Sequence, residues 1–94
     1  MSEMVDLKMI RQDGRALAFI VNQTPKIVLA AVNQNGHALQ FVKKQTPEVV
    51  LAAVKQRRDA IKFVKPELKF LFRKEFEGLS LEEIKAKVPE LFPK

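Results

Sequence analysis

The sequence contains no cysteine. This absence excludes disulfides and thiol chemistry, and it argues against a structural zinc site, which is usually built with Cys ligands. No apolar run approaches the roughly 18 residues of a membrane-spanning helix. The first ten residues, MSEMVDLKMI, lack the basic and then apolar order of a secretory signal. We therefore expect a cytoplasmic protein that does not contact membranes.

Sequence motifs of catalysis are also lacking. The chain has no phosphate-binding glycine loop and no nucleophile motif. His37 is the single histidine, and we expect it to be an exposed turn residue. The acidic pairs Glu75/Glu77 and Glu82/Glu83 fall on predicted helices, and their spacing does not indicate a pocket for acid–base chemistry. We expect a protein that is not an enzyme and uses no cofactor or metal.

What the sequence does have is an internal repeat. Residues 24–45 read TPKIVLAAVNQNGHALQFVKKQ and residues 46–67 read TPEVVLAAVKQRRDAIKFVKPE, with 12 of 22 aligned positions identical. Residues 2–23 match the second copy at 7 of 22 positions. A fixed short period is typical of repeat architectures, in which each unit cannot bury its apolar face alone.

Each copy predicts a short helical hairpin. Thr24-Pro25 suits a helix start, because the hydroxyl caps free N–H groups and proline at the first position loses no bond. Asn35-Gly36 is expected to end this helix through a left-handed backbone, and a second short helix follows. In the third copy Arg57-Arg58 replaces Asn-Gly. Either the two helices merge or an irregular turn is retained, and we favour the retained turn.

The two ends of the chain depart from the repeat. The first copy has polar residues at apolar positions, as expected of a capping repeat. After Val64 the pattern predicts a helix from Pro66 to Gly78, and then a helix that starts with a Ser80/Glu83 capping box and ends before Pro89. We expect one all-α, solenoid-like domain of residues 1–94, comprising repeats 2–23, 24–45 and 46–67 and a C-terminal helical cap, 68–94.

The repeated strings resemble a known family. TPEVVLAAVKQ and QNGHALQFVKKQ are similar to a bacterial family of tandem repeats catalogued as domain of unknown function 4116. The resemblance extends from Val5 to about Lys65 and departs at Arg57-Arg58 and in the polar first helix. It implies tandem helical units and brings no catalytic residue.

Positive charge is concentrated in the second half of the chain. Residues 43–74 contain ten Lys and Arg and three acidic residues, within a chain of net charge +6. On α-helices, Lys62 with Lys65 and Lys69 with Arg73 would each share a face. The candidate anion- or partner-binding residues are Arg57, Arg58, Lys62, Lys65, Lys69, Arg73 and Lys74. A basic surface that only keeps the protein in solution is the alternative.

Two further ladders follow the repeat period. Phe19, Phe41 and Phe63 are expected to lie in the core, with base stacking as the alternative. Glutamines recur near the end of each first helix, where we expect hydrogen bonds to neighbouring backbone and consider a ligand-reading row second. These are Gln12, Gln34 and Gln56.

These patterns favour a non-enzymatic binding module that engages another protein. Its surface is predicted from the positions that differ between copies, 11/33/55, 15/37/59 and 18/40/62. Binding of nucleic-acid phosphates through the basic region is the competing hypothesis. A third possibility is self-association through the apolar C-terminal tail.

Overall fold

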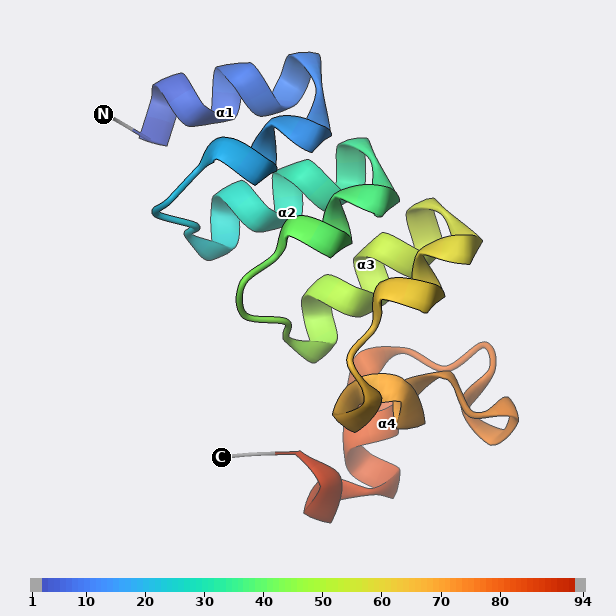
Figure 1. Cartoon of the computed structure of the whole chain (residues 1–94). Coiled ribbons are helices and arrows are strands. Elements are labelled where there is room, and N and C mark those ends of the chain that lie inside the picture. The colour runs from blue at the N-terminus through green and yellow to red at the C-terminus, as the bar shows by residue number, and fades with distance from the viewer. Residues whose placement is uncertain (1–2, 93–94) are drawn as a thin grey trace.

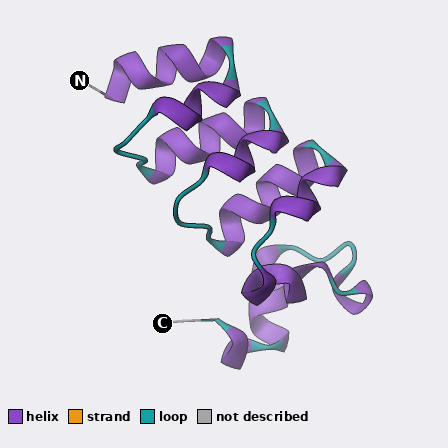
Figure 2. Ribbon diagram, viewed as in Figure 1, coloured by secondary structure: helices purple, strands orange, loops and turns teal. Residues whose placement is uncertain are grey.

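The computed structural model describes residues 3–92, and all its regular elements there are helices (Figures 1 and 2). The expected all-α class is confirmed. One pair of elements occurs three times: an α-helix of ten residues and a 3-10 helix of six. The α-helices are α1 (Glu3–Gln12), α2 (Pro25–Gln34) and α3 (Pro47–Gln56), and the 3-10 helices are η1 (Gly14–Phe19), η2 (Gly36–Phe41) and η3 (Arg58–Phe63).

The three pairs stack in chain order and form two layers. Helices α1, α2 and α3 lie side by side in one layer, and η1, η2 and η3 form the other (Figure 1). Equivalent residues of successive repeats therefore lie next to each other along the stack.

Local chemistry sets the helix ends. The Thr24 and Thr46 hydroxyls accept hydrogen bonds from the Ile27 and Val49 N–H groups, both at 3.3 Å, and proline follows each threonine. At the other end, the residue between the two helices has an extended backbone in every copy, with φ of −157° at Asp13, −151° at Asn35 and −148° at Arg57. The retained turn in the third copy is confirmed. The expected left-handed ending at Asn35-Gly36 is wrong, because both residues have negative φ.

The middle repeat is covered from both sides. Ile27, Val28, Ala31 and Val32 of α2 are all buried. In α1, by contrast, Val5 at the position of Ile27 is 45% exposed. The first repeat therefore has an uncovered face that carries exposed apolar residues, Val5 and Met9 among them, and so departs from the polar outer face expected of a capping repeat.

The C-terminal cap differs in detail from the prediction. The helix expected from Pro66 is two 3-10 helices, η4 (Pro66–Phe72) and η5 (Lys74–Phe76), followed by Gly78 at φ +82°. The predicted last helix is confirmed: α4 (Leu81–Lys87) starts with the Ser80/Glu83 capping box. The final 3-10 helix, η6 (Pro89–Leu91), brings the Phe92 ring edge-on to Phe70, with centroids 5.5 Å apart.

Candidate functional site

Glycine and glutamine lock each repeat to the next one. The Gly14 N–H donates to Gln34 Oε1 at 2.7 Å, and the Gly36 N–H donates to Gln56 Oε1 at 2.6 Å. A Cβ on Gly14 would lie 2.7 Å from the Ala31 carbonyl oxygen, so glycine permits the close approach of the next helix. This contact, rather than a left-handed backbone, explains the glycine in the turn.

The predicted role of the first glutamine ladder is confirmed for Gln34 and Gln56, whose side chains bond to backbone of the preceding repeat. Within residues 3–92 the exposed Gln12 side chain makes no such bond. A second pair of glutamines was missed. Gln23 Oε1 accepts a hydrogen bond from the Lys43 N–H at 2.9 Å, and Gln23 Nε2 donates one to the Phe41 carbonyl at 2.9 Å. In the next repeat, Gln45 Oε1 accepts from the Lys65 N–H at 2.9 Å and Gln45 Nε2 donates to the Phe63 carbonyl at 2.8 Å. Their recurrence at one repeat position, followed by Glu67, was the available sequence clue.

The third repeat lacks the residues that make both contacts with a following repeat, the turn glycine and the linker glutamine. Arg58 stands where the earlier copies have glycine, and Glu67 stands where they have Gln23 and Gln45. Arg58 has a Cβ, so another helix could not pack against it as closely as α2 packs against Gly14. Glu67, when ionised, cannot donate a hydrogen bond to a backbone carbonyl as Gln23 and Gln45 do. A fourth repeat therefore cannot dock as the second and third do. The C-terminal cap covers this face of α3 instead, burying Val50 completely.

The cap covers α3 only in part and leaves a groove of about 690 Å³. Apolar side chains from α3 and the cap form much of its lining, and charged side chains of α3 and η3 lie along it. Glu48 lies near the start of α3, whereas Lys55 and Arg58 lie near its end. The apolar lining consists of Leu51, Ala52, Val54, Phe72, Leu79 and Leu81.

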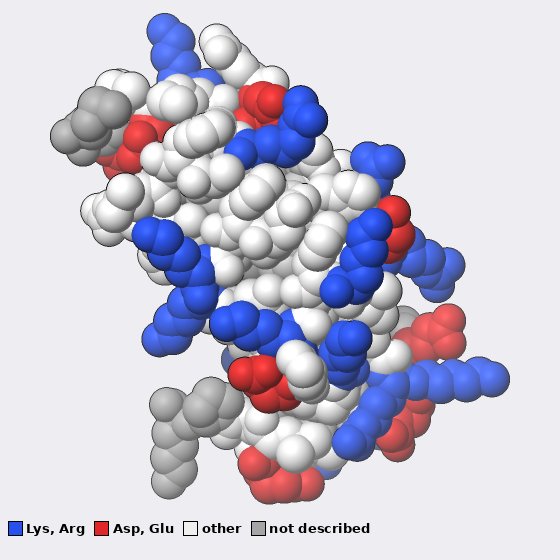
Figure 3. Space-filling view, viewed as in Figure 1, with Lys and Arg blue, Asp and Glu red and all other residues white. Residues whose placement is uncertain are grey.

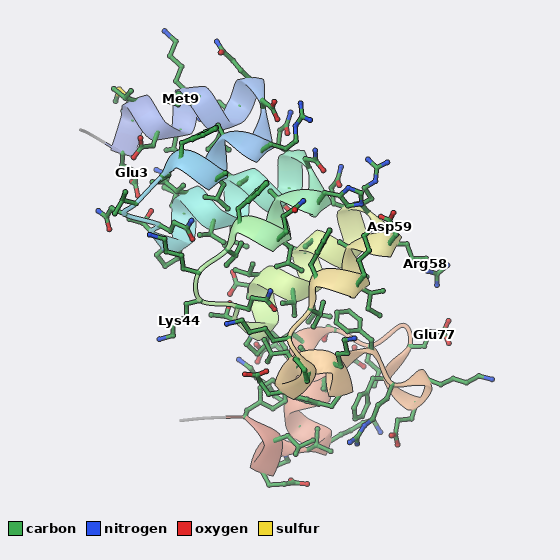
Figure 4. All side chains as sticks on the ribbon, viewed as in Figure 1. Glu3, Met9, Lys44, Arg58, Asp59 and Glu77 are labelled. Carbon is green, nitrogen blue, oxygen red and sulfur yellow. The ribbon has the colours of Figure 1, made fainter. Side chains whose placement is uncertain are left out.

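A second hollow of about 440 Å³ shares Val54, Arg58 and Phe72 with the first. It adds Ile61, two more cations, Arg73 and Lys74, and an acidic residue, Glu77. Figure 4 shows Arg58 and Glu77 on the same side of the molecule, one from the third repeat and the other from the cap. We call the two hollows together the cap groove. Its four cations are Lys55, Arg58, Arg73 and Lys74.

The seven predicted basic residues are all exposed, but they do not share one helical face. Lys62 lies in η3 and Lys65 in the connection after it, while Arg73 lies between η4 and η5. The expected α-helical pairing was wrong, because these segments have 3-10 geometry. Arg57 pairs with Asp59 at 3.6 Å and Arg73 with Glu75 at 3.9 Å. Basic side chains are spread over the visible face with acidic ones among them (Figure 3). The structure brings Arg58, Arg73 and Lys74 together at the cap groove.

His37 is not the exposed turn residue that we expected. Its side chain is 26% exposed, its ring lies edge-on to Phe63, and Nε2 is 2.6 Å from Asp59 Oδ1. The hydrogen bond from His37 lowers the pKa of the Asp59 carboxyl, with smaller effects of nearby cations. Asp59 follows His37 by one repeat period, so the stack brings the two side chains together.

The phenylalanine ladder splits by position. Phe41 and Phe63 are half-buried, whereas Phe19 is 82% exposed, so the expected core position is wrong for Phe19.

The three variable rows come from both layers of the stack. Positions 11, 33 and 55 lie on the α-helices and are exposed, whereas positions 15/37/59 and 18/40/62 lie on the 3-10 layer. A partner that contacts all three rows would therefore have to contact both layers.

The carboxylates of the cap have structural contacts. Glu83 Oε1 accepts the Ser80 N–H at 3.0 Å, and this hydrogen bond lowers the pKa of Glu83. Glu82 pairs with Lys85 at 3.9 Å. Within residues 3–92 no three His, Asp or Glu side chains gather as a metal site would require. In the same range no helix has the length and apolar character needed to cross a bilayer.

Comparison with known proteins gives one family match. Residues 24–69 match the family model described as Domain of unknown function (DUF4116). The match covers the second and third repeats and the start of the cap, and it confirms the resemblance seen in the repeated strings. No curated protein and no solved structure matches the chain.

Proposed function

We propose that this chain is a non-enzymatic binding module that engages another protein through the cap groove. The observation that carries the proposal is the groove itself, in which an apolar lining is bordered by four cations. An amphipathic segment of a partner would bury its apolar face against Leu51, Val54 and Phe72, as helices do in hydrophobic grooves. A bacterial source, which the family resemblance implies, and a cytoplasmic location belong to the same proposal.

Charge defines the partner more closely. The groove has four basic residues and only two acidic ones. The basic residues are Lys55, Arg58, Arg73 and Lys74, and the acidic residues are Glu48 and Glu77. Complementary charge steers association and selects partners. We therefore propose that the partner segment is acidic on its polar face.

The test uses two probes: a fluorescent helical peptide with Leu at spacings of three and four residues on one face and Glu on the other, and a random-sequence DNA duplex. The double variant Lys55→Glu/Arg58→Glu changes the groove. Its matched control, Lys26→Glu/Lys44→Glu, makes the same change in net charge at exposed residues outside it. We expect fluorescence anisotropy to show peptide binding that weakens at least tenfold in the groove variant and less than threefold in the control.

The competing hypothesis gives a different pattern. Binding to phosphates would make the DNA affinity fall linearly with salt in a log–log plot, with a slope that counts contacts. If both double variants weaken DNA binding equally and the peptide does not bind, the groove proposal fails and the basic region acts as a general anion-binding surface.

A further inference from the structure

The N-terminal end of the stack exposes apolar side chains. Among the described residues seven large apolar side chains are exposed, and five of them belong to the first repeat. The exposed fractions are 78% for Met4, 45% for Val5, 39% for Met9, 82% for Phe19 and 82% for Val21. The remaining two, Ile61 and Leu91, lie far along the chain. Soluble monomers seldom gather apolar residues in this way, and such patches mark interaction sites.

Three of these residues, Val5, Met9 and Phe19, occupy positions that are buried or half-buried in the later repeats, whereas the equivalents of Met4 and Val21 are exposed. Ile27 and Ala31 of α2, equivalent to Val5 and Met9, are 1% and 0% exposed because α1 and η1 cover them. Phe63, equivalent to Phe19, packs on His37 of the repeat before it. Figure 4 places Met9 on α1, at the end of the stack away from the cap. The end face therefore has the form of a repeat interface without its neighbour.

We propose that a second copy of this chain covers this face, and that the two first repeats pack against each other about a two-fold axis. A head-to-tail arrangement would instead require the third repeat of one copy to receive the first repeat of the next. Arg58 in place of the turn glycine prevents that approach, and the cap occupies part of α3. A two-fold arrangement uses the same patch twice and closes.

The charges of the first repeat fit this arrangement. Residues 1–23 contain three acidic and three basic residues, so the net charge of +6 lies entirely in residues 24–94. When two copies meet through their first repeats, the positively charged regions, residues 24–94 of each copy, stay apart and repel each other less. Helix α1 has Glu3 and Asp6 in its first turn and Arg11 in its last. In an antiparallel pair each acidic end lies beside a basic end, and the helix dipoles also oppose.

The available area sets the strength of the dimer. Across its long axis the molecule measures 27 × 19 Å. A cross-section of this size allows at most about 500 Å² per copy to be buried, and thus about 1,000 Å² in total, near the lower limit for specific interfaces. We therefore expect a weak dimer whose mass depends on concentration.

Sedimentation velocity from about 1 μM to 1 mM tests the proposal, because a weak dimer should form within this range. The wild type should shift from the monomer mass of 10.7 kDa to twice that value. Phe19→Asp should stay monomeric throughout, and since Phe19 is 82% exposed the variant should keep the wild-type circular dichroism. Leu91→Asp, a matched change at an exposed apolar residue of the C-terminal tail, should dimerise as the wild type does.

Three outcomes would overturn the proposal. They are a wild type that stays monomeric at every concentration, dimers lost in Leu91→Asp but retained in Phe19→Asp, and masses that grow beyond the dimer. The second result would assign association to the tail, and the third would indicate an open head-to-tail contact. None of these outcomes bears on peptide binding at the cap groove, so the two proposals can fail separately.

Discussion

Replacing Gly36 by alanine tests the lock between repeats. The added Cβ would overlap the Ala53 carbonyl oxygen and lie 2.8 Å from the Arg57 Cβ, both parts of the next repeat. The second and third repeats must then move apart, and the bond from the Gly36 N–H to Gln56 Oε1, now 2.6 Å, weakens. Because the obstacle is backbone, a side-chain rotation cannot relieve it.

The expected loss is large for a chain of this length. Overpacking costs about 1–3 kcal/mol, and the weakened hydrogen bond costs about 1 kcal/mol. The free energy of unfolding should therefore fall by about 2–4 kcal/mol, from a total of about 5–14 kcal/mol for 94 residues at the usual value per residue. Urea denaturation followed by circular dichroism measures the difference.

The third repeat supplies the control. Arg58 occupies the equivalent position and already has a Cβ, and a fourth repeat does not lie against it. Arg58→Ala should therefore change the free energy of unfolding by less than about 0.5 kcal/mol, as surface substitutions usually do. The reasoning is refuted if Gly36→Ala is as mild as Arg58→Ala, because the close approach would then have no energetic consequence.

Two other changes probe the stack. Gln45→Ala leaves the Phe63 carbonyl and the Lys65 N–H without their partner, and thermal unfolding should show a loss of about 1–3 kcal/mol. Gln12→Ala, at an exposed side chain, should show almost none. Asp59→Asn removes a carboxylate whose pKa is lowered by His37. The ionised form stabilises the fold above its unfolded pKa of about 3.9. The variant should therefore be less stable at neutral pH, and its difference from the wild type in denaturation midpoint should shrink as the pH falls through the lower folded pKa. A difference that does not change with pH would contradict this assignment.

Much of the fold could be predicted because its determinants are local. Thr-Pro starts, apolar spacing and the Ser80/Glu83 capping box each act within one or two turns of helix. The sequence predicted a second short helix in each repeat but did not show that it would be a 3-10 helix. In the second repeat this helix, Gly36–Phe41, has only six residues and lies between two extended residues, Asn35 and Val42. Such a short segment is closed by bonds from each N–H to the carbonyl three residues before, which favours the 3-10 form.

The site was harder to predict because it depends on contacts between elements. The cap groove forms where η4 and α4 meet α3, and no periodicity in the sequence specifies that meeting. The approach of His37 to Asp59 could have been found from the period alone, since residues 22 apart lie side by side in the stack.

The substitutions that end the regular repeat also shape the cap groove. Where another repeat follows, the chain has a turn glycine and a linker glutamine, as at Gly36 and Gln45. The third copy has Arg58 and Glu67 instead, so the next element cannot approach α3 as closely, and the gap that remains is the cap groove with Arg58 on its wall. The first repeat, by contrast, exposes Phe19 and other apolar side chains. A charged groove beside the cap and an exposed apolar face on the first repeat therefore call for partners of different chemistry.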